Sequence, residues 1–304
     1  MIVNNYLNYV GSKDRYISQI LKFIEHGSTL TGGNQLIDLF CGSAVVGLNA
    51  APYFKSVVCV DACPEIAYLH NWVKGGASAD YLLAEIDLVI AGYGLGKDDK
   101  EGFLRLREYY NEQMYKSGGF IPAQLYCLIT HSYNYSLHLN KRGGFSVPSG
   151  KGRSYFNPAL RNKFSAWKNY LDKNKHVTFK TDDFRNVKVE EPTVFFVDPP
   201  YSAALSKHPY RTGNVKWTEE EDRALLAYLD KLAEEGNYFV FTNAISNNGV
   251  TNTILENWIA NHDNYVVTPV SIDYTNCSYQ RKNGGRTDEV IITNFDIGEK
   301  EWDT

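Results

Sequence analysis

The apolar residues of this chain fall into short continuous runs and longer runs with helical spacing. The short runs are rich in β-branched and aromatic residues and predict buried strands at 35–40, 56–61, 176–184, 193–197 and 237–243. Between them, 42–51 reads as a turn opening a helix. The stretch 217–236 predicts another helix, with Thr218 and Glu221 as a capping box and Gly236 as the stop. Continuous apolar strands that alternate with helices indicate an α/β fold with a parallel sheet covered on both faces.

The middle of the chain has a different pattern. Residues 101–114 and 121–137 carry apolar positions at helical spacing, and the glycine-rich, basic stretch 139–156 predicts a β-hairpin or a loop. Apolar runs near 264–274 and 287–295 predict a terminal antiparallel hairpin. We therefore expect a discontinuous domain of residues 1–71 and 177–304, with residues 72–176 inserted as a second, helical and hairpin-containing domain.

Charge is unevenly distributed, although the net charge of the 304 residues is only −4. Between His138 and Lys180 ten Lys and Arg face a single acid, Asp172, which gives this segment a charge of +9 and leaves −13 for the remainder. Such segregation favours a face that binds a polyanion, and a merely solvated basic surface is the alternative. The five scattered cysteines, the absence of a long apolar run and an N-terminus unlike a signal peptide predict a cytoplasmic protein.

Chemistry-bearing residues follow two of the predicted strands. Phe40 to Ala44 form a glycine-containing turn after the first strand, and Asp61 ends the second strand about 20 residues on, where an acid can hold a ribose. The turn departs from the dinucleotide fingerprint G-x-G-x-x-G, which argues against a nicotinamide dehydrogenase. A tight turn with an acid as a strand-end cap remains the alternative at this point.

A third strand, 193–197, ends on Asp198, Pro199, Pro200 and Tyr201. An adenine amino group is a poor nucleophile because its lone pair is delocalised into the ring. The Asp198 carboxylate and the Pro199 carbonyl could accept both amino hydrogens and turn that lone pair out of the ring plane. Tyr201 could stack on a base that has left the duplex. A strand-terminating turn with a buried acid is the alternative.

Six motifs resemble, in order, those of the adenine-specific DNA methyltransferases of the Dam-like group (D12 class, alpha motif order). They are 8–20 (NYVGSKDRYISQI), DLFCGSA around Phe40, 139–150 (LNKRGGFSVPSG), 181–187 (TDDFRNV), VDPPY and 281–294 (RKNGGRTDEVIITN). Ala44 stands where the family usually has a second glycine. The resemblance implies a Rossmann-like S-adenosylmethionine-dependent sheet and nominates cofactor-binding residues, namely Tyr9, Lys13, Phe40, Gly42, Asp61, Asp183, Phe184 and Asp198. It makes Asp198, Pro199, Pro200 and Tyr201 the catalytic motif.

The resemblance further implies methyl transfer to adenine in double-stranded DNA by base flipping and direct displacement, with no metal, membrane or obligate protein partner. The inserted residues 72–176 then form a target-recognition domain, whose candidate DNA-binding residues are Asn140, Lys141, Arg142, Lys151 and Arg153. Arg142 is the candidate for reading guanine, because Arg pairs bidentately with that base. The hairpin resembles those of enzymes that read GATC, with Lys141 where an apolar residue is common.

Three alternatives stay open. The target amino group could belong to cytosine or to an RNA base, or the chain could be a catalytically silent DNA-binding module on the same fold. Residues 202–217 are either a mobile loop that orders over DNA or an ordinary surface connection.

Overall fold

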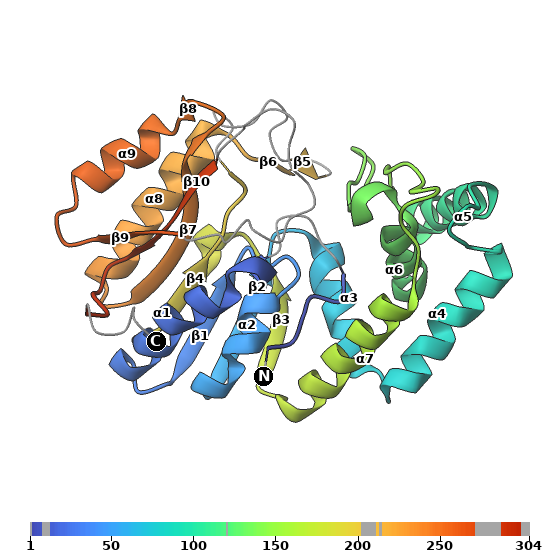
Figure 1. Cartoon of the computed structure of the whole chain (residues 1–304), viewed down its shortest axis with the longest axis horizontal. Coiled ribbons are helices and arrows are strands. Elements are labelled where there is room, and N and C mark those ends of the chain that lie inside the picture. The colour runs from blue at the N-terminus through green and yellow to red at the C-terminus, as the bar shows by residue number, and fades with distance from the viewer. Residues whose placement is uncertain are drawn as a thin grey trace.

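Eight strands form one sheet in the order β3-β2-β1-β4-β7-β10-β9, with β8 paired to β7 (Figure 1). This computed structural model describes residues 2–7, 13–119, 121–201, 211–212, 215–270 and 287–298. The strands are β1 (Gln35–Leu39), β2 (Ser56–Asp61), β3 (Val177–Thr181), β4 (Val194–Val197), β7 (Tyr238–Asn247), β8 (Val250–Thr251), β9 (Val266–Pro269) and β10 (Thr287–Thr293). A separate pair joins β5 (Arg211–Thr212) to β6 (Val215–Lys216).

The connectivity of the sheet determines where a ligand can bind. From β1 the chain moves outward to β2 and β3, and then crosses to β4 on the other side of β1. These strands and β7 are parallel, whereas β10 is antiparallel to both β7 and β9. Open sheets bind ligands outside the carboxyl ends of strands where the order reverses, which here is between β1 and β4.

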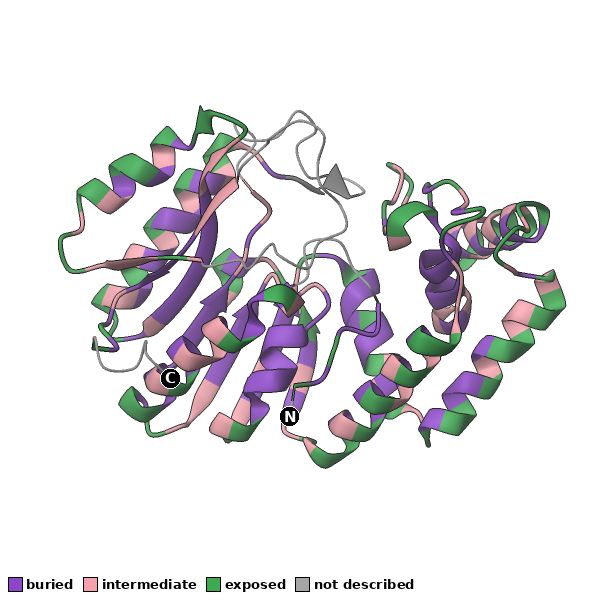
Figure 2. Ribbon diagram, in the orientation of Figure 1, coloured by how far each residue is buried: buried purple, intermediate pink, exposed green. Residues whose placement is uncertain are grey.

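Alternate residues of each central strand face opposite layers of helices, which explains the continuous apolar runs. On β4, Val194 and Phe196 join the core beneath α1–α3, whereas Phe195 and Val197 join the core beneath α8 and α9. Figure 2 shows these strands as almost wholly buried. The helices are α1 (Ile17–Leu30), α2 (Val45–Ala50), α3 (Pro64–Gly75), α8 (Glu219–Glu234) and α9 (Thr253–Ala260), with short 3-10 turns at η1 (Lys13–Arg15), η2 (Ala51–Tyr53) and η4 (Phe184–Asn186). The predicted α/β fold is confirmed.

The predicted start of α8 is also confirmed. The Thr218 side chain accepts a hydrogen bond from the Glu221 amide, at 3.5 Å, and four acidic residues occupy the first turn. Acidic side chains there stabilise the helix because they face the positive end of its dipole. Gly236, at φ +81°, lies just past the helix end.

Helices from the middle of the chain pack beside the sheet, on the right of Figure 1. They are α4 (Ala79–Tyr93), α5 (Glu101–Ser117), α6 (Pro122–His131) and α7 (Pro158–Lys173), with a 3-10 turn η3 (Tyr133–Tyr135). Their apolar side chains belong to the same buried cluster as α1–α3. Within the predicted hairpin, one antiparallel bridge joins Leu139 to Phe145. The expected boundary at residue 72 falls within α3, and the division into two domains stays a prediction.

Four of the five cysteines lie within the described residues, and Cys277 lies outside them. Cys41, Cys59, Cys63 and Cys127 are free and buried, as expected of reduced core thiols. In the described part of the chain, no helix has the length and apolarity needed to cross a membrane.

Candidate active site

Most of the predicted site residues meet at the carboxyl edge of the sheet. Leu39 of β1 pairs with Val197 of β4, so Phe40 and Asp198 leave neighbouring strands side by side. Asp61 ends β2, which lies on the other side of β1. The VDPPY motif and the glycine turn therefore belong to one edge, as the sequence predicts. Tyr9 lies outside the described residues.

The turn after β1 has an unusual backbone. Phe40, Gly42 and Ala44 all have positive φ angles, at +60°, +47° and +55°. A non-glycine residue in this region costs about 1–2 kcal/mol, so Phe40 and Ala44 are held there by their surroundings. Ala44 occupies the place of the usual second glycine and takes the conformation that glycine adopts freely.

Asp61 fastens this turn to the second strand. One of its carboxylate oxygens accepts the Gly42 amide at 2.9 Å, and the other accepts the Cys63 amide, also at 2.9 Å. Burial raises the pKa of the Asp61 carboxyl, and the two amide donors act against that rise. A carboxylate has about four lone pairs, so each oxygen keeps capacity for a ligand hydroxyl.

An aromatic cluster lies beside the turn. The Phe40 ring centroid is 5.6 Å from that of Phe184 and 5.4 Å from that of Trp217. The Trp217 indole N–H donates to Asp222 at 2.7 Å, which fixes the indole at the start of α8. Phe184 follows β3, so the cluster joins segments from three parts of the chain, with Phe184 and Trp217 buried and Phe40 partly exposed at the sheet edge.

Asp183, the second residue predicted from the TDDFRNV motif, lies at the surface. Its side chain accepts the Arg185 amide at 3.0 Å and pairs with the Arg185 guanidinium at 2.8 Å. That guanidinium also pairs with Glu221 and lies 4.5 Å from the centroid of the Phe184 ring. Asp183 therefore caps the 3-10 turn η4, and its role toward a cofactor stays a prediction.

Asp198 sits between two elements far apart in sequence. The Lys13 ammonium lies 2.6 Å from its Oδ1, and the side chains of the two residues are only 7% and 17% exposed. The Thr242 hydroxyl of β7 donates to the same oxygen at 2.8 Å. Burial raises the pKa of the Asp198 carboxyl, while Lys13 and Thr242 act against that rise. Both partners favour the ionised, hydrogen-bond-accepting form.

Tyr201 is held by its hydroxyl. That hydroxyl donates to Glu289 of β10 at 2.5 Å, and the Lys13 ammonium lies 5.7 Å from the ring centroid. Burial, followed by the Glu289 carboxylate, raises the pKa of Tyr201. The phenol therefore stays protonated and keeps donating. Tyr16, whose ring centroid lies 5.9 Å from the Lys13 ammonium, also hydrogen-bonds with Glu289.

The two prolines behave as the sequence predicts. Strand β4 ends at Val197, immediately before Asp198, and Pro199 is buried. Proline lacks the N–H that a further strand residue would need. The motif therefore turns away from the sheet and places its acid and its aromatic ring at the edge.

A third acid, Asp38 of β1, lies beneath the site. It is fully buried and accepts the Gly47 amide at 2.8 Å. Burial raises the pKa of this carboxyl to about 8. Asp38 is therefore largely neutral at pH 7 and does not add a full negative charge to those of Asp61 and Asp198.

Four contributors to this edge were missed at the level of the sequence: Tyr16, Trp217, Thr242 and Glu289. Tyr16 stands three residues after Lys13, and Thr242 is a polar residue near the end of an apolar strand. Both positions carry a weak signal. Glu289 has none, because its contact with Tyr201 depends on β10 lying next to β7.

The candidate DNA-binding residues lie on the helical side of the molecule. The Arg142 guanidinium carbon is 4.0 Å from the centroid of the Tyr115 ring, and Asn140 donates to the Tyr115 hydroxyl at 2.8 Å. Asn140 also accepts the Arg142 amide at 2.9 Å. This arrangement orients an exposed arginine. Lys141 is exposed as well.

Two further basic candidates are exposed, and one basic residue of the segment is not. Lys151 and Arg153 lie at the surface, and Arg153 donates to the Tyr133 hydroxyl at 3.2 Å. Lys168 is buried and pairs with Asp172 at 2.5 Å. Lys168 is one of the ten basic residues between His138 and Lys180, but because it is buried it cannot contribute to an exposed basic face.

Near these residues the backbone is strained. Asn134 and Tyr135 are consecutive non-glycine residues with φ of +56° and +54°.

Within the described ranges, no group of three or more His, Cys, Asp or Glu is placed to hold a metal ion.

Comparison with known proteins defines the class. Residues 9–268 match the family described as D12 class N6 adenine-specific DNA methyltransferase, and the chain belongs to this family. It is 30% identical over 295 residues to the Type II methyltransferase M.FokI of Planomicrobium okeanokoites, covering 95% of this chain and 42% of that protein. It is 26% identical over 232 residues to the DNA adenine methylase of Serratia marcescens, covering 73% and 77%.

The chain is also 28% identical over 298 residues to the modification methylase StsI of Streptococcus sanguinis, covering 95% of this chain and 42% of that protein. It therefore spans less than half the length of both M.FokI and StsI. Among solved structures, the rRNA methyltransferase aviRa from Streptomyces viridochromogenes has a TM-score of 0.38 at 13% identity, covering 93% of this chain and 88% of that one. That score is below the level at which two folds are taken as the same.

The pairing of Lys13 with Asp198 gives a direct test. Lys13→Met removes the ammonium that lowers the pKa of the Asp198 carboxyl, so this pKa should rise further and the protonation midpoint should move to higher pH. Carboxyl ¹³C NMR of Asp198 measures it. At pH 7 the uncompensated buried carboxylate should also reduce the free energy of unfolding by about 3 kcal/mol.

That loss should shrink as the pH falls through the raised pKa, because the folded state then takes up the proton more readily than the unfolded chain. Lys116→Met is the matched control, since Lys116 pairs with Glu112 at the surface. It should change the free energy of unfolding by less than about 1 kcal/mol and leave the Asp198 titration unmoved. An unchanged Asp198 titration in Lys13→Met contradicts the pairing.

Proposed function

We propose that this chain transfers the methyl group of S-adenosylmethionine to the exocyclic amino group of adenine in double-stranded DNA. Membership of the D12 class and the names of its relatives support the reaction type. The observation that carries the proposal is the Asp198 carboxyl group, paired with Lys13 and hydrogen-bonded by Thr242 next to the turn that follows β1.

The residues at the sheet edge fit S-adenosylmethionine. The positive-φ turn at Phe40–Ala44 would let the backbone approach a ligand closely, and Asp61, at the end of β2, would accept two ribose hydroxyls. The Phe40 ring, partly exposed and packed against the buried rings of Phe184 and Trp217, would offer aromatic surface for an adenine ring. The proposed cofactor-binding residues also include Lys13, Asp183 and Tyr9. When bound, this cofactor supplies a methyl group from its positively charged sulfur. The product that remains is S-adenosylhomocysteine.

The catalytic motif would act on the target base. The Asp198 carboxylate and the Pro199 carbonyl accept the two amino hydrogens, so the nitrogen lone pair turns toward the methyl group. A bond from this nitrogen to the methyl carbon would form as the carbon–sulfur bond breaks, and the nitrogen would release one proton. Positioning the two reactants in line supplies much of the acceleration in such a reaction.

Tyr201 would stack on the adenine, with its ring orientation fixed through the Glu289 contact. The amino nitrogen cannot be reached while the base is stacked in a duplex, so the base must swing out. A base that has left the stack recovers part of that cost on an aromatic ring. We therefore include base flipping in the proposal.

The inserted residues 72–176 would recognise the DNA. Arg142, braced by Tyr115, is proposed to read guanine in the major groove. Asn140 orients it, whereas Lys141, Lys151 and Arg153 would contact phosphates and supply salt-dependent affinity. The exposed cations lie on a body that is acidic elsewhere, which directs the polyanion to this side.

The alternatives are less well supported. Methylation of a cytosine or RNA amino group and a silent DNA-binding module are the alternatives, whereas the family match is to adenine-specific enzymes and the acid of VDPPY is paired with Lys13. A cytoplasmic site of action, in a prokaryotic or phage-infected cell, completes the proposal. The relatives named as modification methylases suggest a role in DNA modification.

Asp198→Ala tests the catalytic assignment. Because the carboxylate orients the amino group, its loss should lower kcat for methyl transfer at least about 100-fold, whereas binding of S-adenosylmethionine and of duplex DNA should change far less. A tritiated-methyl transfer assay measures the rate, and calorimetry measures the binding. Asp263→Ala, at the opposite, amino edge of the sheet, is the control and should keep its rate. Unchanged turnover in Asp198→Ala rejects the catalytic role.

Arg142→Ala and Lys151→Ala separate reading from anchoring. In Arg142→Ala the loss of a bidentate contact should reduce the binding free energy by about 1–3 kcal/mol and relax the preference at one base pair. In Lys151→Ala the loss of a phosphate contact should weaken binding to cognate and scrambled duplexes alike. It should also reduce the slope of log affinity against log salt by about 1. Fluorescence anisotropy on both duplexes at several salt concentrations measures this. Equal losses on both duplexes for Arg142→Ala contradict its reading role.

A further inference from the structure

His70 of α3 is a fully buried histidine next to the turn that follows β1. Its Nε2 lies 2.8 Å from the carbonyl oxygen of Gly42, and its Nδ1 lies 3.1 Å from the hydroxyl oxygen of Tyr6. His70 belongs to none of the motifs that the family resemblance singled out. Its two ring nitrogens nevertheless join the glycine turn to the N-terminal segment.

The two contacts define the state of the imidazole. A carbonyl oxygen only accepts hydrogen bonds, so Nε2 carries the proton and donates it to Gly42. In the neutral ring Nδ1 is then an acceptor, and the Tyr6 hydroxyl donates to it. Burial lowers the pKa of His70 to about 4, so the ring is neutral at physiological pH. The Tyr6 hydroxyl thereby fixes the tautomer that the Gly42 contact requires.

Gly42 is consequently held at both of its backbone polar groups. Its N–H donates to Asp61 at 2.9 Å, and its C=O accepts from His70 at 2.8 Å. The strained turn persists only if its surroundings over-determine it. The Ala44 amide also donates to the Cys41 carbonyl across the turn at 2.6 Å, and the His70 contact adds a side-chain donor from α3 to the Gly42 carbonyl.

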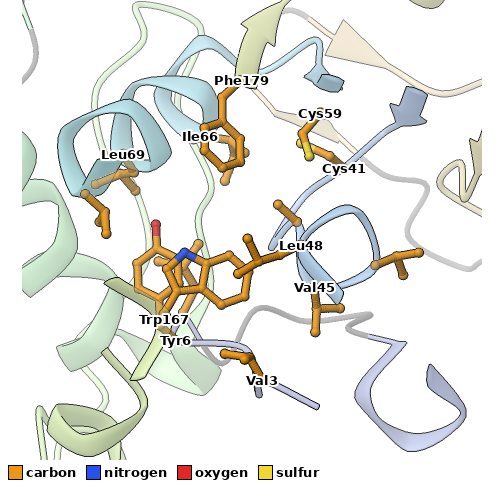
Figure 3. Packing of buried hydrophobic residues seen from close by; sticks show 14 of the residues in the cluster. Val3, Tyr6, Cys41, Val45, Leu48, Cys59, Ile66, Leu69, Trp167 and Phe179 are labelled. Atoms are coloured by element: carbon orange, nitrogen blue, oxygen red, sulfur yellow. The ribbon is translucent and has the colours of Figure 1, made fainter. Parts of the chain in front are cut away.

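The ring of His70 and the hydroxyl of Tyr6 are themselves fixed by aromatic packing. The imidazole stacks on Phe179, with centroids 4.7 Å apart, and on Trp167, with centroids 6.2 Å apart. The Tyr6 ring stacks on Tyr126 of α6 at 5.8 Å, and Tyr126 donates to the Tyr6 carbonyl at 3.0 Å. Figure 3 shows Tyr6 and Trp167 side by side in this core. Helices α6 and α7, from the inserted segment, therefore hold the Tyr6 and His70 rings in place.

We propose that His70, with its tautomer set by Tyr6, is a positioning residue that holds the Gly42 carbonyl and so shapes the turn for S-adenosylmethionine. This inference rests on the proposed function, because it assumes that the turn binds that cofactor. It assigns His70 no contact with substrate. Its loss should therefore raise the KM and the dissociation constant for the cofactor, with little effect on kcat at saturation.

The test compares three variants in the whole chain. His70→Leu keeps the bulk and removes both hydrogen bonds, Tyr6→Phe keeps the ring and removes one, and His70→Gln retains an N–H for Gly42 and an acceptor for Tyr6. His70→Leu should raise the KM and Kd for S-adenosylmethionine by about 10-fold or more, with kcat falling less than about 3-fold. Tyr6→Phe should raise both by about 3- to 5-fold, and His70→Gln should restore most of the loss.

His176→Gln is the matched control. The His176 Nε2 also contacts a backbone carbonyl, that of Ala51 at 3.0 Å, but His176 precedes β3 and lies at the amino edge of the sheet. It should leave the cofactor Kd unchanged. Long-range ¹H–¹⁵N NMR of the wild-type chain should show His70 as the Nε2–H tautomer.

The outcomes separate the two proposals. A wild-type chain that does not bind S-adenosylmethionine contradicts the proposed function itself. Binding by the wild type, with equal binding by folded His70→Leu and Tyr6→Phe, overturns the positioning role alone. If His70→Leu does not fold, Tyr6→Phe and the NMR tautomer decide. An unchanged KM in Tyr6→Phe together with an Nδ1–H tautomer is then the contradicting result.

Discussion

The buried ion pair between Lys13 and Asp198 is the interaction on which this site depends. Removing a carboxylate from water costs several kcal/mol unless a cation and hydrogen-bond donors compensate for it. Lys13 supplies the charge and Thr242 supplies a donor, so the acid stays ready to accept. The same pair ties the N-terminal segment to the end of β4, and Thr242 joins β7 to the same carboxylate. Lys13 also lies near the rings of Tyr16 and Tyr201, which places the cation among the aromatic groups of the edge.

The strand order explains why the chemistry gathers at this edge. Because the chain leaves β1 in one direction and returns to its other side through β4, the carboxyl ends of β1, β2 and β4 lie side by side where the strand order reverses. Side chains from the neighbouring elements then secure each loop. Asp61 and His70 hold Gly42, and Glu289 holds Tyr201. The turn is strained, and the contacts around it are what maintain it.

Much of this could be predicted from the sequence because the signals are local. Apolar runs define the strands, two prolines end β4, and Asp61 closes β2, so the meeting of Phe40, Asp61 and Asp198 follows from parallel pairing. The resemblance in motif order nominated Lys13 for the cofactor, and its contact with Asp198 emerges only from the folded chain.

Contacts between distant segments could not be predicted in this way. Glu289 reaches Tyr201 because β10 is inserted antiparallel beside β7, an arrangement that leaves no periodic trace at residue 289. Lys168 is buried although composition alone places it with the exposed cations. The basic stretch forms a turn with isolated bridges at Leu139 and Ser149 in place of a regular strand, because the Asn140 side chain accepts the Arg142 and Gly144 amides locally.

The central claim is that the ionised Asp198 orients an adenine amino group for direct displacement. The most direct test incubates this chain with duplex DNA and S-adenosylmethionine that carries a trideuterated methyl group, followed by mass spectrometry of the digested nucleosides. The account predicts N6-methyldeoxyadenosine that retains all three deuterium atoms, because the methyl group passes in one step without losing hydrogen. Label on deoxycytidine, or an unlabelled duplex after incubation with a chain shown to bind the cofactor, would contradict it.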